Sequence, residues 1–295
     1  MFERAEPHEY VAYFGARFAL ALFGALPLKA ASGLGGWIGR TIGPKLGVRK
    51  HALANLRLAM PELTPEQQQQ ILVGMWDNLG RVIAEYAHLG DIRINTPEQA
   101  GEVEIVGGEH LTAIRDSGQP AIIFGAHYGN WEVASLVGAH YRLSMVQVYR
   151  AANNPLTEEL LQKLRAPVGG RHVPKGIRAA RELLKALKQN EHLCMLVDQK
   201  LSTGIPVPFF GHDAMTAPAV AELALRAQCP LVPIRVERLG GTQFRFVVEK
   251  PFLLTDSGNR DADVFNGLVL INSFMERWIR ARPDHWFWVH KRWKR

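Results

Sequence analysis

Apolar runs alternate with amphipathic segments over the last two thirds of the chain. Runs of strand length that are rich in β-branched residues occupy 103–106, 120–125, 145–149, 193–197, 231–236 and 243–248. Segments with helical length and periodicity lie between them at 108–116, 131–140, 155–166, 176–189, 217–227 and 263–281. Strands separated by helices of this size predict an α/β fold with a mixed, largely parallel central sheet flanked by helices.

The first 95 residues follow a different pattern. Residues 10–28 form an apolar stretch of about the length that crosses a bilayer, although Arg17 interrupts it. Basic residues follow it, so the positive-inside rule places the rest of the chain in the cytoplasm. The stretch is predicted to be a single span, or a helix lying in the cytoplasmic leaflet with Arg17 reaching the headgroups; a soluble buried helix is the third interpretation. We therefore expect a hydrophobic, membrane-associated helical region over 1–95 and an α/β domain over 96–295.

Two further helices are expected within this N-terminal region. Residues 48–59 have the pattern of a short amphipathic helix. A longer one is predicted from Thr64 to about Leu89, with Thr64 as N-cap, Pro65 in the first turn and Gln67 completing a capping box.

Composition and charge narrow the function classes. The chain of 295 residues has 47% apolar and 21% charged residues, which favours a folded domain with a sizeable core. The net charge of +7 suits nucleic acid, an anionic membrane or a phosphorylated substrate. Two cysteines, Cys194 and Cys229, are interpreted as buried thiols in a reducing compartment. No metal-binding, P-loop or dinucleotide motif occurs, so neither a metal nor a cofactor is predicted.

The strongest candidate for chemistry is the segment from His127 to Glu132, between an apolar strand and a helix. Gly129 and Asn130 favour a tight turn that brings Glu132 back towards the imidazole. A carboxylate on one ring nitrogen would fix the tautomer and leave the other nitrogen free to accept a proton. The structural alternative is a capped helix with a hydrogen-bonded histidine nearby.

Other candidates lie at later strand ends. Arg150, Arg165 and Lys175 belong to a basic cluster, which includes Arg171 and Arg178, and which either binds phosphate or forms a solvated face. Asp198 and Gln199 follow a strand and are expected to point into the cleft of His127, or to cap their own loop.

Two aromatic segments complete the candidates. Phe209 and Phe210 lie in a proline-containing loop and either line an apolar pocket or pack in the core. Residues 286–295 mix aromatics with cations, as at a bilayer interface or a nucleic-acid surface.

Several short motifs occur together in a fixed order along the chain. They are Asn55-Leu56 ahead of Pro61, Asn78-Gly80-Arg81-Glu85, the His127–Glu132 box, Tyr149-Arg150 with Asn154-Pro155-Leu156, Asp198-Gln199, and residues 207–211 with Thr216, followed by the tryptophan-rich tail. This ordered set resembles the lipid A biosynthesis acyltransferase family, the lauroyl and myristoyl acyltransferases of Gram-negative bacteria. One departure is Ala126, where many relatives have a polar residue.

The resemblance implies transfer of a fatty acyl group from acyl carrier protein to a hydroxyl of a lipid A precursor, at the inner membrane with the catalytic domain facing the cytoplasm. It implies His127 as general base and Glu132 as its orienting partner, and it places Asn130, Arg165 and Asp198 in the site. Phe209 and Phe210 would line the acyl pocket. A glycerophospholipid acyltransferase, or a membrane-bound esterase or thioesterase, is the alternative. No nucleic-acid partner is expected, because no nucleic-acid-binding module is recognisable.

Overall fold

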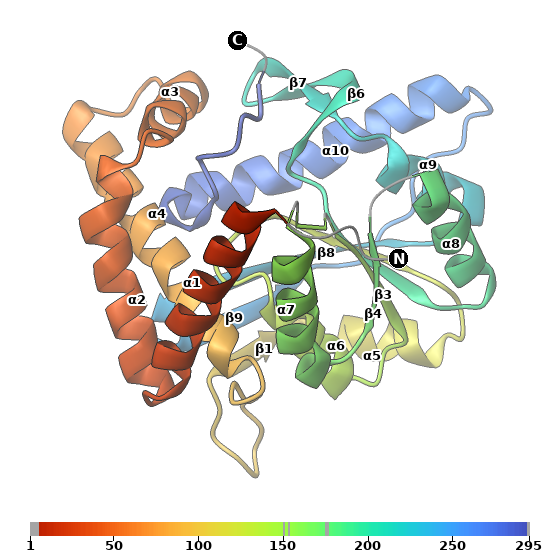
Figure 1. Ribbon diagram of the computed structural model, residues 1–295. Coiled ribbons are helices and arrows are strands. Elements are labelled where there is room, and N and C mark those ends of the chain that lie inside the picture. Colours follow the sequence, from red (N-terminus) through yellow and green to blue (C-terminus); the bar gives the residue numbers. More distant parts are fainter. Residues whose placement is uncertain (1–5, 150, 153, 175–176, 294–295) are drawn as a thin grey trace.

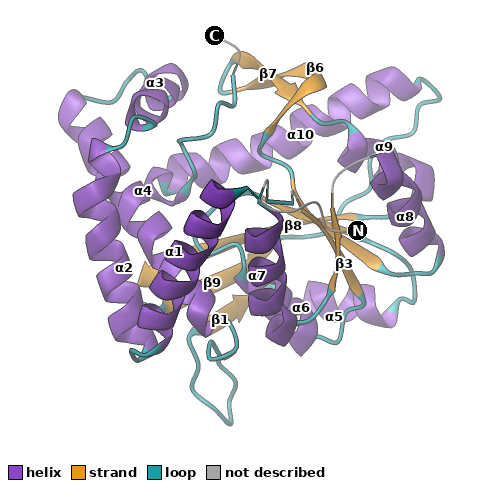
Figure 2. Ribbon diagram, viewed as in Figure 1, coloured by secondary structure: helices purple, strands orange, loops and turns teal. Residues whose placement is uncertain are grey.

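A seven-stranded sheet forms the centre of the molecule, and helices cover both of its faces (Figures 1 and 2). This computed structural model describes residues 6–149, 151–152, 154–174 and 177–293. The strands follow the order β1-β9-β8-β2-β5-β3-β4, where β1 is Val103–Val106, β2 Ile122–Gly125, β3 Met145–Tyr149, β4 Arg171–Pro174, β5 His192–Leu196, β8 Leu231–Gly240 and β9 Gln243–Val248. Among these strands β8 and β9 pair antiparallel and the other neighbours pair parallel, so the predicted sheet type is confirmed.

The alternation of side chains along β2 builds two cores. Ile122 and Phe124 belong to one apolar cluster and Ile123 to the other, as a pleated strand requires. The first cluster is completed by α8 (Ile177–Lys188), α9 (Ala219–Ala227) and α10 (Arg260–Ala281), and the second by α5 (Gly108–Asp116) and α6 (Val133–His140). The sheet is therefore buried on both faces, which explains the continuous apolar runs of its strands.

Four helices form the N-terminal region: α1 (Pro7–Gly24), α2 (Leu28–Ile42), α3 (Arg49–Ala59) and α4 (Pro65–Glu85). Glycines allow α2 and α4 to pack with their backbones in contact. A Cβ atom at Gly39 would lie 2.0 Å from the carbonyl oxygen of Trp76, and one at Gly80 would lie 2.1 Å from that of Gly35. Only glycine permits this approach, which accounts for the glycine-rich sequence of α2.

The predicted membrane span finds no support. Within the described residues, no helix combines the length and the apolarity that crossing a bilayer requires. The apolar stretch 10–28 is divided, because α1 ends at Gly24 and α2 begins at Leu28. The buried-helix alternative also fails for one face of α1, since Val11, Phe14 and Phe18 are 74%, 59% and 66% exposed.

Apart from the divided stretch 10–28, the predicted helices and strands agree with the structure, and three strands were not predicted. The capping box is confirmed, because Thr64 Oγ1 accepts from the Gln67 main-chain N–H at 3.3 Å and Gln67 Oε1 accepts from the Thr64 N–H at 2.8 Å. The strands not predicted are β4 and the hairpin of β6 (Lys200–Phe209) and β7 (His212–Thr216), which forms a separate two-stranded sheet. The helix α7 (Pro155–Arg165) begins where the sequence predicts it.

Candidate active site

The register of two neighbouring strands places His127 opposite Asp198. The strands β2 and β5 are parallel, with Gly125 paired to Leu196, so the residues two positions beyond each strand meet at the same sheet edge. Carboxyl ends of parallel strands are where α/β sheets form their binding clefts. Asp198, predicted to point into the cleft of His127, is thus in direct contact with it.

A buried carboxylate holds the His127 ring by one nitrogen. The distance from His127 Nδ1 to Asp198 Oδ1 is 2.8 Å. The other oxygen, Oδ2, accepts from the main-chain N–H of His127 at 3.0 Å and from the indole N–H of Trp286 at 2.8 Å. Burial opposes ionisation of Asp198, which is 2% exposed, but the interactions with His127 and Trp286 outweigh it and lower its pKa to about 2.

This arrangement fixes the tautomer of the imidazole. An ionised carboxylate only accepts hydrogen bonds, so Nδ1 of His127 carries the proton and the lone pair of neutral His127 lies on Nε2. Nε2 lies 3.3 Å from the side-chain Nε2 of Gln199, and His127 lines a cavity of about 360 Å³. A molecule in that cavity that took the place of the Gln199 amide at Nε2 could therefore give its proton to this nitrogen.

Glu132 does not orient His127, contrary to the sequence prediction. Its carboxylate is 5% exposed and pairs with Arg165, whose Nε and Nη2 lie 3.0 and 2.8 Å from its two oxygens. Trp131 Nε1 donates to it at 3.1 Å, and the Tyr86 hydroxyl donates as well. Burial opposes its ionisation, but Arg165 and Tyr86 lower its pKa. The prediction chose the carboxylate nearest in sequence, whereas the sheet register supplies a different one.

Arg165 joins three elements around this carboxylate. Its Nη2 donates to the Tyr86 hydroxyl at 3.0 Å, and its guanidinium lies over the rings of Tyr86 and Tyr149, 5.7 and 5.9 Å from their centroids. Burial opposes a charged Arg165, but Glu132 and Tyr86 raise its pKa above the ordinary value. Arg165 also lines the cavity of His127, so the buried Arg165–Glu132 pair forms part of its wall.

Asn130 lies behind the site and is fully buried. Its Nδ2 donates to Glu85 at 2.8 Å, and its Oδ1 accepts from the main-chain N–H of Glu132 at 3.2 Å. Gly129 precedes it with a φ of +59°, and Asn78 Nδ2 donates to the Gly129 carbonyl at 2.9 Å. Asn130 was predicted to contact substrate, but in the structure its side chain stabilises the turn that follows His127. Asn78 and Glu85 of α4 hold this turn in place, so the N-terminal region supports the site.

The remaining predicted residues fall into two groups. Arg150 and Lys175 lie outside the described residues. Phe209 and Phe210 line neither of the cavities next to His127 in the described part of the chain; both are buried, and the Phe209 ring stacks on Trp293 with centroids 5.5 Å apart. The alternative of core packing is thus the observed one.

The aromatic C-terminal segment is part of the core and of the site, which the sequence did not predict. Trp286, Trp288 and Trp293 are at most 4% exposed, so they do not form a bilayer or nucleic-acid surface. The ring of Phe287 lies 6.1 Å from that of His127, and the Phe287 main-chain N–H donates to the His127 carbonyl at 3.1 Å. The closely spaced tryptophans of this segment could have indicated a buried position, because large aromatic side chains fill a core as well as an interface.

A second, apolar cavity adjoins that of His127. It has a volume of about 680 Å³ and lies among α8, α9, β6 and the start of α10. Val148, Leu196 and Gln199 line both cavities. Leu183, Ile205 and Leu223 contribute to its apolar wall. Two neighbouring cavities, one polar and one mostly apolar, match a ligand with a reactive polar end and a long apolar tail.

Comparison with known proteins assigns the chain to a family. The profile of the bacterial lipid A biosynthesis acyltransferases matches residues 2–295. The chain belongs to this family. It is similar to the lipid A biosynthesis lauroyltransferase of Escherichia coli K12, with 22% identity over 81% of this chain and 77% of the relative. The palmitoleoyltransferase of the same organism is also 22% identical, over 99% of this chain and 94% of the relative.

A third relative is named for a different lipid acceptor. The phosphatidylinositol mannoside acyltransferase of Mycobacterium tuberculosis is 29% identical over 64% of this chain and 60% of the relative. Family membership makes the protein a transferase that moves an acyl group to a lipid acceptor.

Proposed function

We propose that the protein transfers a fatty acyl group from the thioester of acyl carrier protein to a hydroxyl of a lipid A precursor, with His127 as general base. The observation that carries this proposal is the His127–Asp198 contact of 2.8 Å, which turns Nε2 of the ring, next to the Gln199 amide, towards the cavity. Family membership supports the acyl transfer and the lipid acceptor.

In the proposed reaction, His127 Nε2 removes the proton of the acceptor hydroxyl as its oxygen attacks the thioester carbonyl. The carbonyl oxygen becomes an oxyanion, and the tetrahedral intermediate then expels the thiolate of the carrier. The imidazolium returns its proton to this thiolate, so no net proton is consumed. Asp198, with its lowered pKa, stays ionised and stabilises the imidazolium.

Two side chains are the proposed donors to the oxyanion. The side-chain amide of Gln199 lies within 3.3 Å of the reacting nitrogen of His127. Among the described residues, Arg165 uses Nε and Nη2 for Glu132 and Tyr86, and its Nη1 is the proposed donor. Loss of one such donor typically costs about 10²–10³-fold in rate. The first main-chain N–H groups of α6, another candidate, already donate to Asn130 and Trp131.

A covalent acyl-enzyme is not part of the proposal. Cys194 is the cysteine that lines the cavity, and burial raises the pKa of its thiol to about 12. A thiol with that pKa is almost fully protonated at neutral pH and is a poor nucleophile. Direct transfer between two bound substrates therefore agrees better with the site. The adjoining apolar cavity is proposed to take the acyl chain, in place of the predicted pocket at Phe209 and Phe210.

The exposed apolar face of α1 and α2 is proposed to lie in the inner membrane surface. Phe14 and Phe18 on α1 and Trp37 on α2 are 59%, 66% and 56% exposed. Aromatic side chains beside basic residues such as Arg17 and Arg40 suit the headgroup region of a bilayer with anionic lipid. The protein would then meet its lipid acceptor without leaving the surface.

Mass spectrometry of the lipid product tests the proposal. Purified protein would be given lauroyl-acyl carrier protein with a lipid A precursor, with phosphatidylinositol mannoside, or with no acceptor. We expect the lipid A precursor to gain one acyl group, and His127→Ala to lower this rate about 10²–10⁴-fold while the protein stays folded. Free fatty acid as the sole product would indicate a hydrolase. Acylation of the mannoside alone would reassign the acceptor, and full activity of His127→Ala would refute the general base.

A further inference from the structure

One segment near the N-terminus carries a net positive charge equal to that of the whole chain. Residues 10–61 contain no aspartate or glutamate and carry seven lysines and arginines, and the whole chain has a formal net charge of +7. These cations are Arg17, Lys29, Arg40, Lys45, Arg49, Lys50 and Arg57. The segment contributes most of α1 and all of α2 and α3, in which Glu9 at the start of α1 is the one carboxylate. Arg40 of α2 is paired with Asp77 of α4, so the cations of α1 and α3 and of the turns around them dominate this basic surface.

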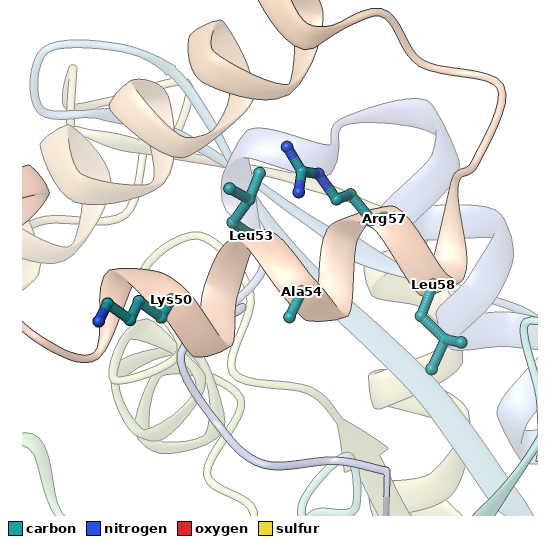
Figure 3. Close-up of a pocket in the computed structure, with 5 residues that line it drawn as sticks. All are labelled: Lys50, Leu53, Ala54, Arg57 and Leu58. Atoms are coloured by element: carbon teal, nitrogen blue, oxygen red, sulfur yellow. The ribbon is translucent and has the colours of Figure 1, made fainter. Parts of the chain in front are cut away.

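The helix α3 has two different faces. Its inner face is buried and consists of Ala52, Asn55, Leu56 and Ala59. Its outer face lines an open hollow of about 560 Å³ and consists of Lys50, Leu53, Ala54, Arg57 and Leu58 (Figure 3). These residues follow the i, i+3, i+4, i+7, i+8 spacing of one helix face.

The inner face of α3 is connected to the active site. Asn55 Nδ2 donates to the carbonyl of Trp288 at 2.8 Å and to that of His290 at 2.6 Å. Phe287 and His290, on the same segment, line the cavity of His127. A partner seated on the outer face of α3 would therefore be separated by the width of this helix, about 10 Å, from the segment that forms one wall of the reaction cavity.

We propose that the outer face of α3 is the docking surface for an acidic, helical acyl carrier protein, whose prosthetic arm then delivers the thioester to His127. The inference rests on the proposed function. Lys50 and Arg57 are seven residues apart, about 10 Å along the helix. That separation matches two carboxylates two turns apart on one face of a partner helix, and the aliphatic side chains between them give that helix an apolar contact.

The composition of the surface favours a protein partner over the membrane at this position. The exposed aromatic residues of the basic region, Tyr10, Phe14, Phe18 and Trp37, lie on α1 and α2, and α3 contains none. Interfacial membrane helices typically carry tryptophan and phenylalanine as well as leucine on their apolar face, whereas the floor of α3 has two leucines and an alanine without aromatics. A short aliphatic floor between two cations suits a complementary protein helix. Figure 1 shows α3 at one end of the molecule, beyond α1 and α2.

Charge reversal on α3 tests the docking surface. The double variant Lys50→Glu/Arg57→Glu would be assayed with lauroyl-acyl carrier protein and with lauroyl-pantetheine, a donor too small to need α3. We expect KM for the carrier-bound donor to rise about tenfold or more, and kcat/KM for lauroyl-pantetheine to stay unchanged. The wild-type kcat/KM for the carrier should fall with salt more steeply than that of the variant. Circular dichroism would verify the fold, and Lys50→Glu alone would serve if the double variant did not fold.

Lys185→Glu/Lys188→Glu is the matched control, because both lysines are exposed on α8. This control should leave kcat/KM for both donors unaffected.

An equal loss of kcat/KM with both donors in Lys50→Glu/Arg57→Glu, or no loss with either, would overturn the docking proposal. So would a loss of binding to anionic phosphatidylglycerol vesicles with unchanged carrier kinetics, which would assign α3 to the membrane. Binding of lauroyl-acyl carrier protein to each variant, measured by biolayer interferometry, tests the surface without turnover. A wild-type protein that acylates no lipid from either donor would instead refute the proposed function.

Discussion

Replacing Asp198 by asparagine would remove one charge from the site at nearly constant shape. The new Oδ1 could still accept from Nδ1 of His127. The new amide group would face the main-chain N–H of His127 or the indole N–H of Trp286, which now donate to Asp198 Oδ2 at 3.0 and 2.8 Å. One of these donors would lose its acceptor, and the imidazolium formed during transfer would lose its counter-charge.

The size of both effects follows from the contacts. General-base catalysis of this kind contributes about 10²–10⁴-fold, so kcat of Asp198→Asn should fall at least about 100-fold, which corresponds to about 3 kcal/mol in the activation barrier. A buried donor without an acceptor costs about 1–3 kcal/mol of stability. Because folded proteins are typically stable by about 5–15 kcal/mol, the variant should remain folded at 25 °C.

The assay is single-turnover transfer of lauroyl from the carrier to the lipid acceptor, with urea unfolding followed in parallel. Asp263→Asn is a matched control, since Asp263 is also a buried carboxylate, 5% exposed, but binds Ser257 at the start of α10. The control should lose stability and keep its turnover. If Asp198→Asn kept more than roughly a tenth of the wild-type rate, the assignment of Asp198 as the orienting carboxylate would be refuted.

Three further predictions concern stability. Glu132→Gln leaves the buried Arg165 without its counter-ion and should lower the free energy of unfolding by about 3–5 kcal/mol in urea titrations; a rate loss without destabilisation would contradict this. The pKa of Asp198 falls from 3.8 to about 2 on folding, so its stabilisation is complete above about pH 4 and lost as the pH falls through 2. The difference in free energy of unfolding between wild type and Asp198→Asn should therefore narrow by about 2 kcal/mol in acid. A difference that stays constant with pH would disprove the lowered pKa of Asp198. Gly129→Ala places a Cβ 1.8 Å from a carbonyl of β8 at a φ of +59°, and should lower Tm far more than Gly118→Ala, whose φ is +63° with open space around it; equal shifts would refute the close packing of the turn.

The sequence was most informative about the sheet. Buried parallel strands are continuous apolar runs, so β2, β3 and β5 could be recognised without knowledge of their neighbours. The strand β4 lies at the edge of the sheet and contains Arg171 and His172, so its pattern is not that of a buried strand. The β6 strand carries Pro206 and Pro208, which argued for a loop, yet it pairs with β7 in a small separate sheet where edge positions tolerate proline.

The site was predicted in part, for a physical reason. His127, Asp198 and Gln199 were recognised because each follows an apolar strand, and clefts form at strand ends. The partner of His127 depends on which strand lies beside β2 and in what register, and neither is encoded in local sequence. The choice of Glu132 followed from proximity along the chain alone. The role of Trp286 depends on the C-terminal segment returning across 88 residues to Asp198, which no periodicity reveals.

The most direct test of the account is the nitrogen-15 NMR spectrum of His127 in protein labelled at histidine, recorded for the wild type, Asp198→Asn and Glu132→Gln at a pH where the ring is neutral. The account predicts the Nδ1–H tautomer in the wild type and in Glu132→Gln, and a changed Nδ1 resonance in Asp198→Asn. A wild-type ring protonated on Nε2, or one that responds to Glu132→Gln and not to Asp198→Asn, would contradict it.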